Sequence, residues 1–141
     1  MTEKELNEIY YINIEIKRLK KEQEELESLS LVKGQEITGL PGGNQTSNKV
    51  ADYAIELAEI KELIELEIKR LYIVRAKIER YIETIDDAEI RLIVRLRAIN
   101  NMRWEDIGEE LGMERTTVSK KYRAFLKLSH KSREGHDNMK S

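Results

Sequence analysis

The sequence predicts an all-α protein, in which a long antiparallel helical hairpin resembling a coiled coil is followed by a smaller three-helix domain. Charged residues make up 37% of the 141 residues, well above the roughly 25% of average domains. One proline and seven glycines supply too few turns for a β-sandwich or barrel. Apolar residues also recur at alternating spacings of three and four, which is the period of packed helices.

The composition excludes several classes of protein. The chain has no cysteine, which rules out disulfides, thiolate metal sites and a cysteine nucleophile. The first residues are charged where a signal peptide needs an apolar core, and no stretch approaches the ~18 apolar residues of a membrane span. We therefore expect a soluble, cytoplasmic protein that does not contact a membrane.

The first helix is predicted over residues 2–29. Its seam residues alternate at spacings of three and four: Ile9, Ile12, Ile16, Leu19, Gln23 and Leu26. The charged residues between them are typical of a solvated helix face. Residues 33–49 then hold four glycines and the only proline, Pro41, which predicts a long connection that is functional or, by preference, mobile.

The second helix is predicted over residues 50–85, a rod of roughly 54 Å. Its seam is continuous: Val50, Tyr53, Leu57, Ile60, Ile64, Glu67, Leu71, Val74, Ile78, Tyr81 and Ile85. A rod of this length needs a partner to bury its seam, and the first helix can fold back as an antiparallel partner. The pattern fits equally well a hairpin that closes within one chain and a hairpin whose helices are exchanged between two chains.

Further apolar residues lie beside this seam, more than one partner helix can cover: Ile55, Leu63, Leu66, Ile68, Ile73 and Ile82. We therefore expect a homo-oligomer, with a dimer favoured. Gln23 and Glu67, the polar residues of the two seams, are candidates for setting the register of the helices.

A domain boundary is predicted between residues 85 and 86, where the heptad pattern ends. Asp86 followed by Glu89 is typical of a helix start. The net charge also changes from −4 before the boundary to +2 after it. Residues 86–133 form the predicted second domain, and residues 134–141 a disordered tail.

Three short helices are predicted in this domain, over residues 88–99, 104–111 and 115–129. Asn100 and Asn101 interrupt the first run, and Gly112 supplies a left-handed residue after the second. Gly108 removes a side chain where two helices approach closely. The buried stripe of the last helix is Val118, Tyr122, Phe125 and Leu126. Three helices with a tight glycine turn before the last are typical of a helix-turn-helix domain.

The outward residues of the last helix suit DNA recognition. Five lie near its start, where a recognition helix meets the major groove: Arg115, Thr116, Ser119, Lys120 and Arg123. Lys and Arg reach guanine edges or phosphates, and Ser and Thr bind phosphates or bases. Further basic residues extend the positive flank: Lys121, Lys127, Lys131 and Arg133. No acidic residue occurs over residues 115–133, which favours DNA binding over an ordinary bundle with a basic surface helix.

The stretch RLIVRLRAINNMRWEDIGEELGMERTTVSKKYRAFLKL resembles region 4 of sigma-70-type factors. The whole chain, with its GLPGG loop and long helix, resembles ArpU- and RinA-like late transcriptional regulators of Gram-positive phages and prophages. Two positions depart from the pattern: Glu114 replaces a common serine cap, and Lys121 replaces a buried aliphatic residue. These departures shift the expected base contacts by up to one position.

The resemblance implies a sequence-specific, DNA-binding regulator that activates phage late genes in the cytoplasm of a bacterial host, on its nucleoid. It implies double-stranded DNA as a partner and RNA polymerase as a further one. No segment resembles those that melt promoters, so an autonomous sigma factor is not expected. Two alternatives are a DNA-packaging subunit of the small terminase type and an adaptor that binds polymerase or another protein without binding DNA.

No catalytic constellation is present, so we expect neither an enzyme nor a small-molecule substrate. The two histidines, His130 and His136, lack the spacing of a metal site, and no cofactor or metal is expected. Trp104 is interpreted as a core anchor. Tyr10 and Tyr11 are expected to pack on the hairpin.

Overall fold

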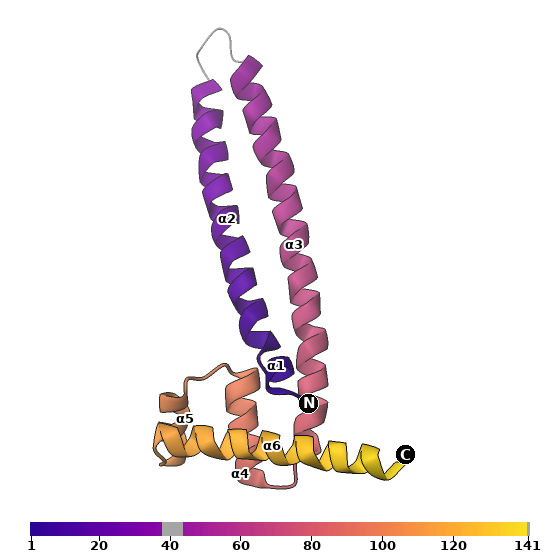
Figure 1. The fold of residues 1–141 in the computed structure, drawn as a ribbon. Helices are drawn as coiled ribbons and strands as arrows, with labels where there is room; N and C mark the ends of the chain where they lie inside the picture. The colour runs from indigo at the N-terminus through magenta and orange to yellow at the C-terminus, as the bar shows by residue number, and fades with distance from the viewer. Residues whose placement is uncertain (38–43, 141) are drawn as a thin grey trace. The chain divides into compact units, whose positions relative to one another are not determined.

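The computed structural model describes the backbone of residues 1–37 and 44–140 and the side chains of residues 1–31 and 49–129. Every element of this part is helical (Figure 1), which confirms the all-α prediction. The elements are α1 (Glu3–Leu6), α2 (Glu8–Ile37), α3 (Asn44–Glu83), α4 (Ala88–Val94), the π-helical turn η1 (Arg95–Ile99), α5 (Trp104–Leu111) and α6 (Arg115–Lys140). Within these residues, none of the helices combines the length and apolar composition needed to cross a bilayer.

Contacts divide the chain into two compact units. We call residues 12–71 the arm, and residues 1–11 together with 72–141 the head. In the arm, α2 and α3 of the same chain run antiparallel, side by side (Figure 1). Ile12, Ile16 and Ile64 are buried between them, and the other described seam positions of the arm are half-buried. The predicted hairpin pairing is therefore confirmed.

The ends of the hairpin helices differ from the prediction. The first predicted helix is divided at Asn7 into α1 and α2, and α2 continues to Ile37. Because α3 begins at Asn44, both ends of the predicted 33–49 connection are helical. One internal glycine, Gly34, costs about 1 kcal/mol relative to alanine, too little to end a helix of this length. The centre of the predicted loop, residues 38–43 with all of GLPGG, lies outside the described residues.

The head joins the N-terminal segment to the C-terminal part of the chain. Its buried apolar side chains come from every element: Leu6, Ile9, Ile78, Ile82, Ile85, Ile93, Val94, Leu96, Ala98, Ile107, Val118, Tyr122 and Leu126. Lys77 Nζ also lies 3.6 Å from Glu5 Oε1. The head thus begins within α3, before the predicted boundary at residue 86. Ile82 was expected beside the seam, among the apolar residues that one partner helix cannot cover, but it is fully buried, because the last turns of α3 belong to this core.

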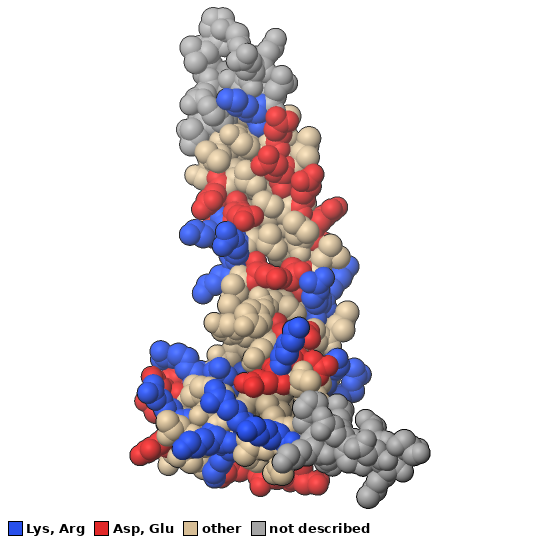
Figure 2. Space-filling view, in the orientation of Figure 1, with Lys and Arg blue, Asp and Glu red and all other residues tan. Residues whose placement is uncertain are grey.

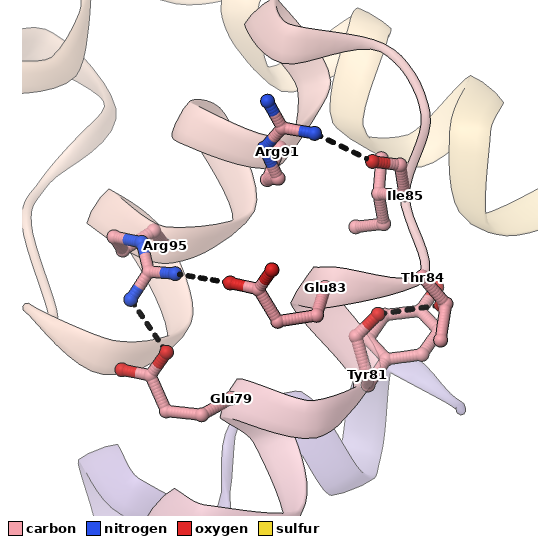
Figure 3. Close-up of polar contacts among 7 residues, drawn as sticks. All are labelled: Glu79, Tyr81, Glu83, Thr84, Ile85, Arg91 and Arg95. Carbon is pink, nitrogen blue, oxygen red and sulfur yellow. Dashed lines mark hydrogen bonds and ion pairs between the residues drawn. The ribbon is translucent and has the colours of Figure 1, made fainter.

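The connection from α3 to α4 is held by polar contacts (Figure 3). Arg91 Nη1 donates to the carbonyl oxygen of Ile85 at 3.0 Å, and Thr84 Oγ1 donates to that of Tyr81 at 2.6 Å. The N-cap of α4 is Asp87 rather than Asp86, since its Oδ1 accepts the backbone N–H groups of Glu89 and Ile90 at 2.8 and 3.1 Å. These contacts set where α4 starts after α3.

The three predicted helices of the head occur in order. The first ends in the π-helical turn η1 and stops at Asn100 and Asn101, where Asn101 has a φ of 54°. The second has the predicted bounds, Trp104–Leu111. The third, α6, was expected to end near residue 129 before a disordered tail over residues 134–141. Instead its backbone is helical to Lys140, because this segment has no proline and only one glycine to end the helix.

Candidate nucleic-acid interface

The turn between α5 and α6 depends on two glycines. Gly112 ends α5 in the left-handed conformation, with a φ of 66°, and the backbone N–H of Met113 donates to the Gly108 carbonyl at 2.9 Å. A Cβ added at Gly108 would lie 2.5 Å from the Met113 carbonyl oxygen. Gly108 is therefore needed for a close approach, as predicted, but the approaching group is the backbone of the turn rather than a crossing helix.

A packed core of side chains from α5 and α6 supports the turn. Val118 and Tyr122 of α6 and Ile107 of α5 are almost fully buried, and burial raises the pKa of the Tyr122 phenol. The Trp104 ring meets the Tyr122 ring edge to face, with the centroids 5.1 Å apart. Trp104 thus packs against the core residue Tyr122, but it is half-buried and also lines a surface hollow, so it is less buried than the core anchor expected from the sequence. This packing holds α6 in one orientation on α5.

Opposite this core, α6 presents a stripe of basic and hydroxyl side chains, which we call the recognition stripe: Arg115, Thr116, Ser119, Lys120, Arg123 and Lys127. All are exposed except Ser119, which is half-buried and whose Oγ donates to the Thr116 carbonyl at 3.1 Å. Steps of three or four residues place most of these positions on one helix face. In Figure 2, Lys and Arg side chains gather over α5 and the first part of α6.

Lys121 lies on the other flank of α6, away from the recognition stripe. Its Nζ is 2.7 Å from Glu89 Oε1, so this lysine joins α6 to α4. The sequence interpretation assigned Lys121 to phosphate contact, whereas in the structure its charge is paired within the head. The remaining basic residues of the predicted flank, Lys131 and Arg133, and both histidines lie outside the residues whose side chains are described.

Two arginines near the stripe were missed by the sequence interpretation. Arg97 of η1 and Arg103, which precedes α5, line a surface hollow together with Trp104, Glu105, Arg115, Thr116 and Ser119. We call it the recognition hollow. The guanidinium of Arg97 lies over the Trp104 ring, 4.4 Å from its centroid, and its Nη1 donates to the Met102 carbonyl at 2.9 Å. The repeated arginines of the RLRAINNMR stretch could have indicated these two residues. They were overlooked because they precede the acid-free segment over residues 115–133.

Two ion pairs hold basic groups at the edge of the recognition hollow. Arg115 Nη1 lies 3.1 Å from Glu105 Oε1, and Arg103 Nε lies 3.2 Å from Asp106 Oδ2. The hydrogen bond that Arg103 donates to Asp106, together with the negative charge of this carboxylate, raises the pKa of Arg103. Both pairs are exposed, so each is weak in water and a ligand's phosphate can replace either carboxylate. The site therefore offers several exposed basic groups to an anionic ligand.

Comparison with known proteins gives one match. A family model described as "Protein of unknown function (DUF1492)" matches residues 29–129. Neither the curated proteins nor the solved structures include a match to this chain. The matched region includes α3 and the α5–turn–α6 segment, while α1 and most of α2 precede it.

Proposed function

We propose that this chain, which belongs to the DUF1492 family, is a DNA-binding transcriptional regulator that reads duplex DNA through α6. The observation that carries the proposal is the recognition stripe, an exposed row of basic and hydroxyl groups on a helix held rigidly by α5 and the Gly112 turn. A rigid, protruding helix of this kind fits the major groove of B-DNA.

The roles of the stripe residues follow from their chemistry. Arg115, Lys120 and Arg123 supply charges for guanine edges and phosphates. Thr116 and Ser119 supply short hydroxyls that bind phosphates or bases at close range. Lys127, about one helical turn further along, extends the contact to the backbone. Lys121 is partly exposed but paired with Glu89, and this ion pair joins α6 to α4.

The arm is proposed to join copies of the chain. Apolar side chains remain exposed on its two helices: Ile14, Leu29, Leu31, Ile55, Leu63 and Leu66. Pairing of two arms through these residues would give a dimer with two DNA-binding heads, so that the DNA target would have two half-sites. The resemblance to phage late regulators makes activation of phage late genes the proposed output, with RNA polymerase as a further partner.

The test is binding to a labelled random duplex, followed by fluorescence anisotropy across a range of salt concentrations. The variant Arg115→Ala/Lys120→Ala/Arg123→Ala removes three charges of the stripe. A matched control, Lys17→Ala/Lys20→Ala/Lys21→Ala, removes three exposed charges from α2 of the arm. Each lost phosphate contact should reduce the slope of log affinity against log salt by about one.

We expect wild type and the arm control to bind with the same steep salt dependence, and the stripe variant to bind weakly with a flatter slope. Equal losses in both variants would mean that net charge alone governs binding, which contradicts a recognition helix. Absence of binding by wild type at low salt would favour the adaptor without DNA contact. The mass of the protein in solution decides between a regulatory dimer and the ring expected of a packaging subunit.

A further inference from the structure

A second hollow in the head adjoins the recognition hollow. It is lined by Asn7, Tyr10, Tyr11, Arg97, Asn101 and Arg103, and we call it the tyrosine hollow. Arg97 and Arg103 line both hollows, so the two form one continuous surface. The tyrosine hollow therefore lies beside the DNA-reading face and is built partly from the N-terminal segment.

The two tyrosines are on the surface, contrary to the expectation that they pack on the hairpin. Tyr10 is 50% exposed and Tyr11 61% exposed, because their neighbours Ile9 and Ile12 occupy the buried face of α2. The two rings meet edge to face, with centroids 5.4 Å apart. This contact limits the motion of both rings.

The groups that line the tyrosine hollow have a common chemistry. Two guanidiniums, two amides and two phenols offer hydrogen-bond donors, and none of the six side chains is acidic. Arg97 has one donor committed to the Met102 carbonyl, which leaves the rest of its guanidinium for a ligand. Such a set of donors suits an anionic, oxygen-rich ligand, and phosphate and sugar oxygens of DNA are contacted by the same residue types.

We propose that the tyrosine hollow binds the sugar–phosphate backbone of the same duplex, next to the segment read by α6. This inference rests on the proposed function. The strand would leave the recognition stripe, cross Arg103 and Arg97, and meet the hydroxyls of Tyr10 and Tyr11. The N-terminal segment thus enlarges the DNA contact of a helix-turn-helix that would otherwise use only the C-terminal part of the chain.

The experiment removes only the two hydroxyl groups. Tyr10→Phe/Tyr11→Phe keeps both rings and their edge-to-face contact, so the head should fold as before. The matched control is Tyr72→Phe, a tyrosine of the head that is 65% exposed and lines neither hollow. Affinity for the labelled random duplex is measured by anisotropy for both, with thermal unfolding as a check on folding.

We expect the double variant to bind about thirtyfold more weakly, since two lost hydrogen bonds of roughly 1 kcal/mol each correspond to that factor, and the control to bind like wild type. Arg103→Gln should in addition reduce the salt slope by about one. These results together would support the backbone contact.

Other outcomes overturn this inference without affecting the proposed function. Equal affinity of the double variant and wild type for the full duplex, while Arg115→Ala/Lys120→Ala/Arg123→Ala still flattens the salt slope, removes the tyrosine hollow from the DNA contact. Loss of binding only on Tyr10→Ala/Tyr11→Ala would indicate that the rings stack on bases and do not donate to phosphates. Absence of binding by wild type overturns both proposals together.

Discussion

The guanidinium of Arg95 joins η1 to the last turns of α3, with Nη1 only 2.6 Å from Oε2 of Glu79 (Figure 3). Its Nη2 also lies 3.7 Å from Glu83 Oε1. Arg95 and Glu79 are each about one-third exposed, so water screens their attraction only in part. This pair ties the helix-turn-helix to the helix that precedes it.

The first prediction concerns the strength of this tie. Arg95→Gln, Glu79→Gln and the double variant form a double-mutant cycle, measured by chemical unfolding. We expect a coupling of about 1 kcal/mol, the upper end for exposed pairs, because the geometry is short and partly shielded. Strictly additive losses would show that the pair contributes nothing to stability. Lys69→Gln, an exposed charge of α3 in the arm, is the control for loss of a charge.

The second prediction compares the two glycines of the turn. Gly108→Ala places a Cβ 2.5 Å from the Met113 carbonyl oxygen, and neither atom can move aside unless the backbone shifts. We expect a loss of about 2 kcal/mol in stability. Gly112→Ala has nothing within 4 Å and suffers only from its φ of 66°, which costs about 1 kcal/mol. Thermal unfolding of both variants gives the order, and a larger loss at Gly112 would contradict the close approach.

The third prediction concerns the pH dependence of the arm. Glu67 lies in the α3 seam, and a hydrogen bond with the Glu15 carboxyl, burial and the Glu15 charge raise its pKa, against the opposing charge of Arg70. The folded arm therefore binds this proton more tightly than the unfolded chain, in which the pKa is near 4.5. The Glu67 contribution to stability is greatest below that value and decreases as the pH rises through the raised pKa.

The variant Glu67→Gln isolates this effect. Its amide offers a permanent donor to Glu15, whereas the Glu67 Oε2 of wild type is buried without a partner among the described residues. We expect the variant to be more stable than wild type by about 1 kcal/mol at pH 7, and the difference to vanish below pH 4.5, the ordinary pKa of the group. Thermal unfolding at several pH values measures this. A constant difference at all pH values would contradict it.

The fourth prediction concerns the Tyr122 hydroxyl at the centre of the head. Tyr122 is 1% exposed, and among the described residues its hydroxyl has no hydrogen-bond partner. Tyr122→Phe keeps the ring against Trp104 and removes a buried polar atom, so we expect it to be about 1 kcal/mol more stable. Tyr122→Leu, which also loses the ring, should be less stable than wild type. Chemical unfolding of the two variants tests this, and destabilisation by Phe would reveal a partner for the hydroxyl.

Local signals in the sequence predicted the helix-turn-helix closely. The bounds of α5 and the left-handed Gly112 follow from short-range rules: apolar residues four apart, then a glycine that alone tolerates a positive φ. The seam of the arm followed from its regular spacing for the same reason. Helix bounds, glycine turns and seam spacing depend on residues that are close together in the sequence, so a single sequence is enough to predict them.

Contacts between distant segments were not predicted. The burial of Ile82 and the division of the head between both ends of the chain depend on α1 reaching the last turns of α3, and no local pattern records that. The pairing of Lys121 with Glu89, which lie 32 residues apart in the sequence, was missed because a run of basic residues does not show which of them meets an acid. The sequence also did not show that Arg97, Tyr10 and Tyr11 line surface hollows, because these hollows are formed by segments that are distant in the sequence.

The ion pair between Glu5 and Lys77 has a consequence for synthesis on the ribosome. The N-terminal segment of the head emerges first, and its partner in α3 follows about seventy residues later. At translation rates of about 5–20 residues per second, Leu6 and Ile9 remain uncovered for on the order of 4 to 14 s. During this interval the nascent chain displays apolar side chains that a chaperone or a second nascent chain can bind.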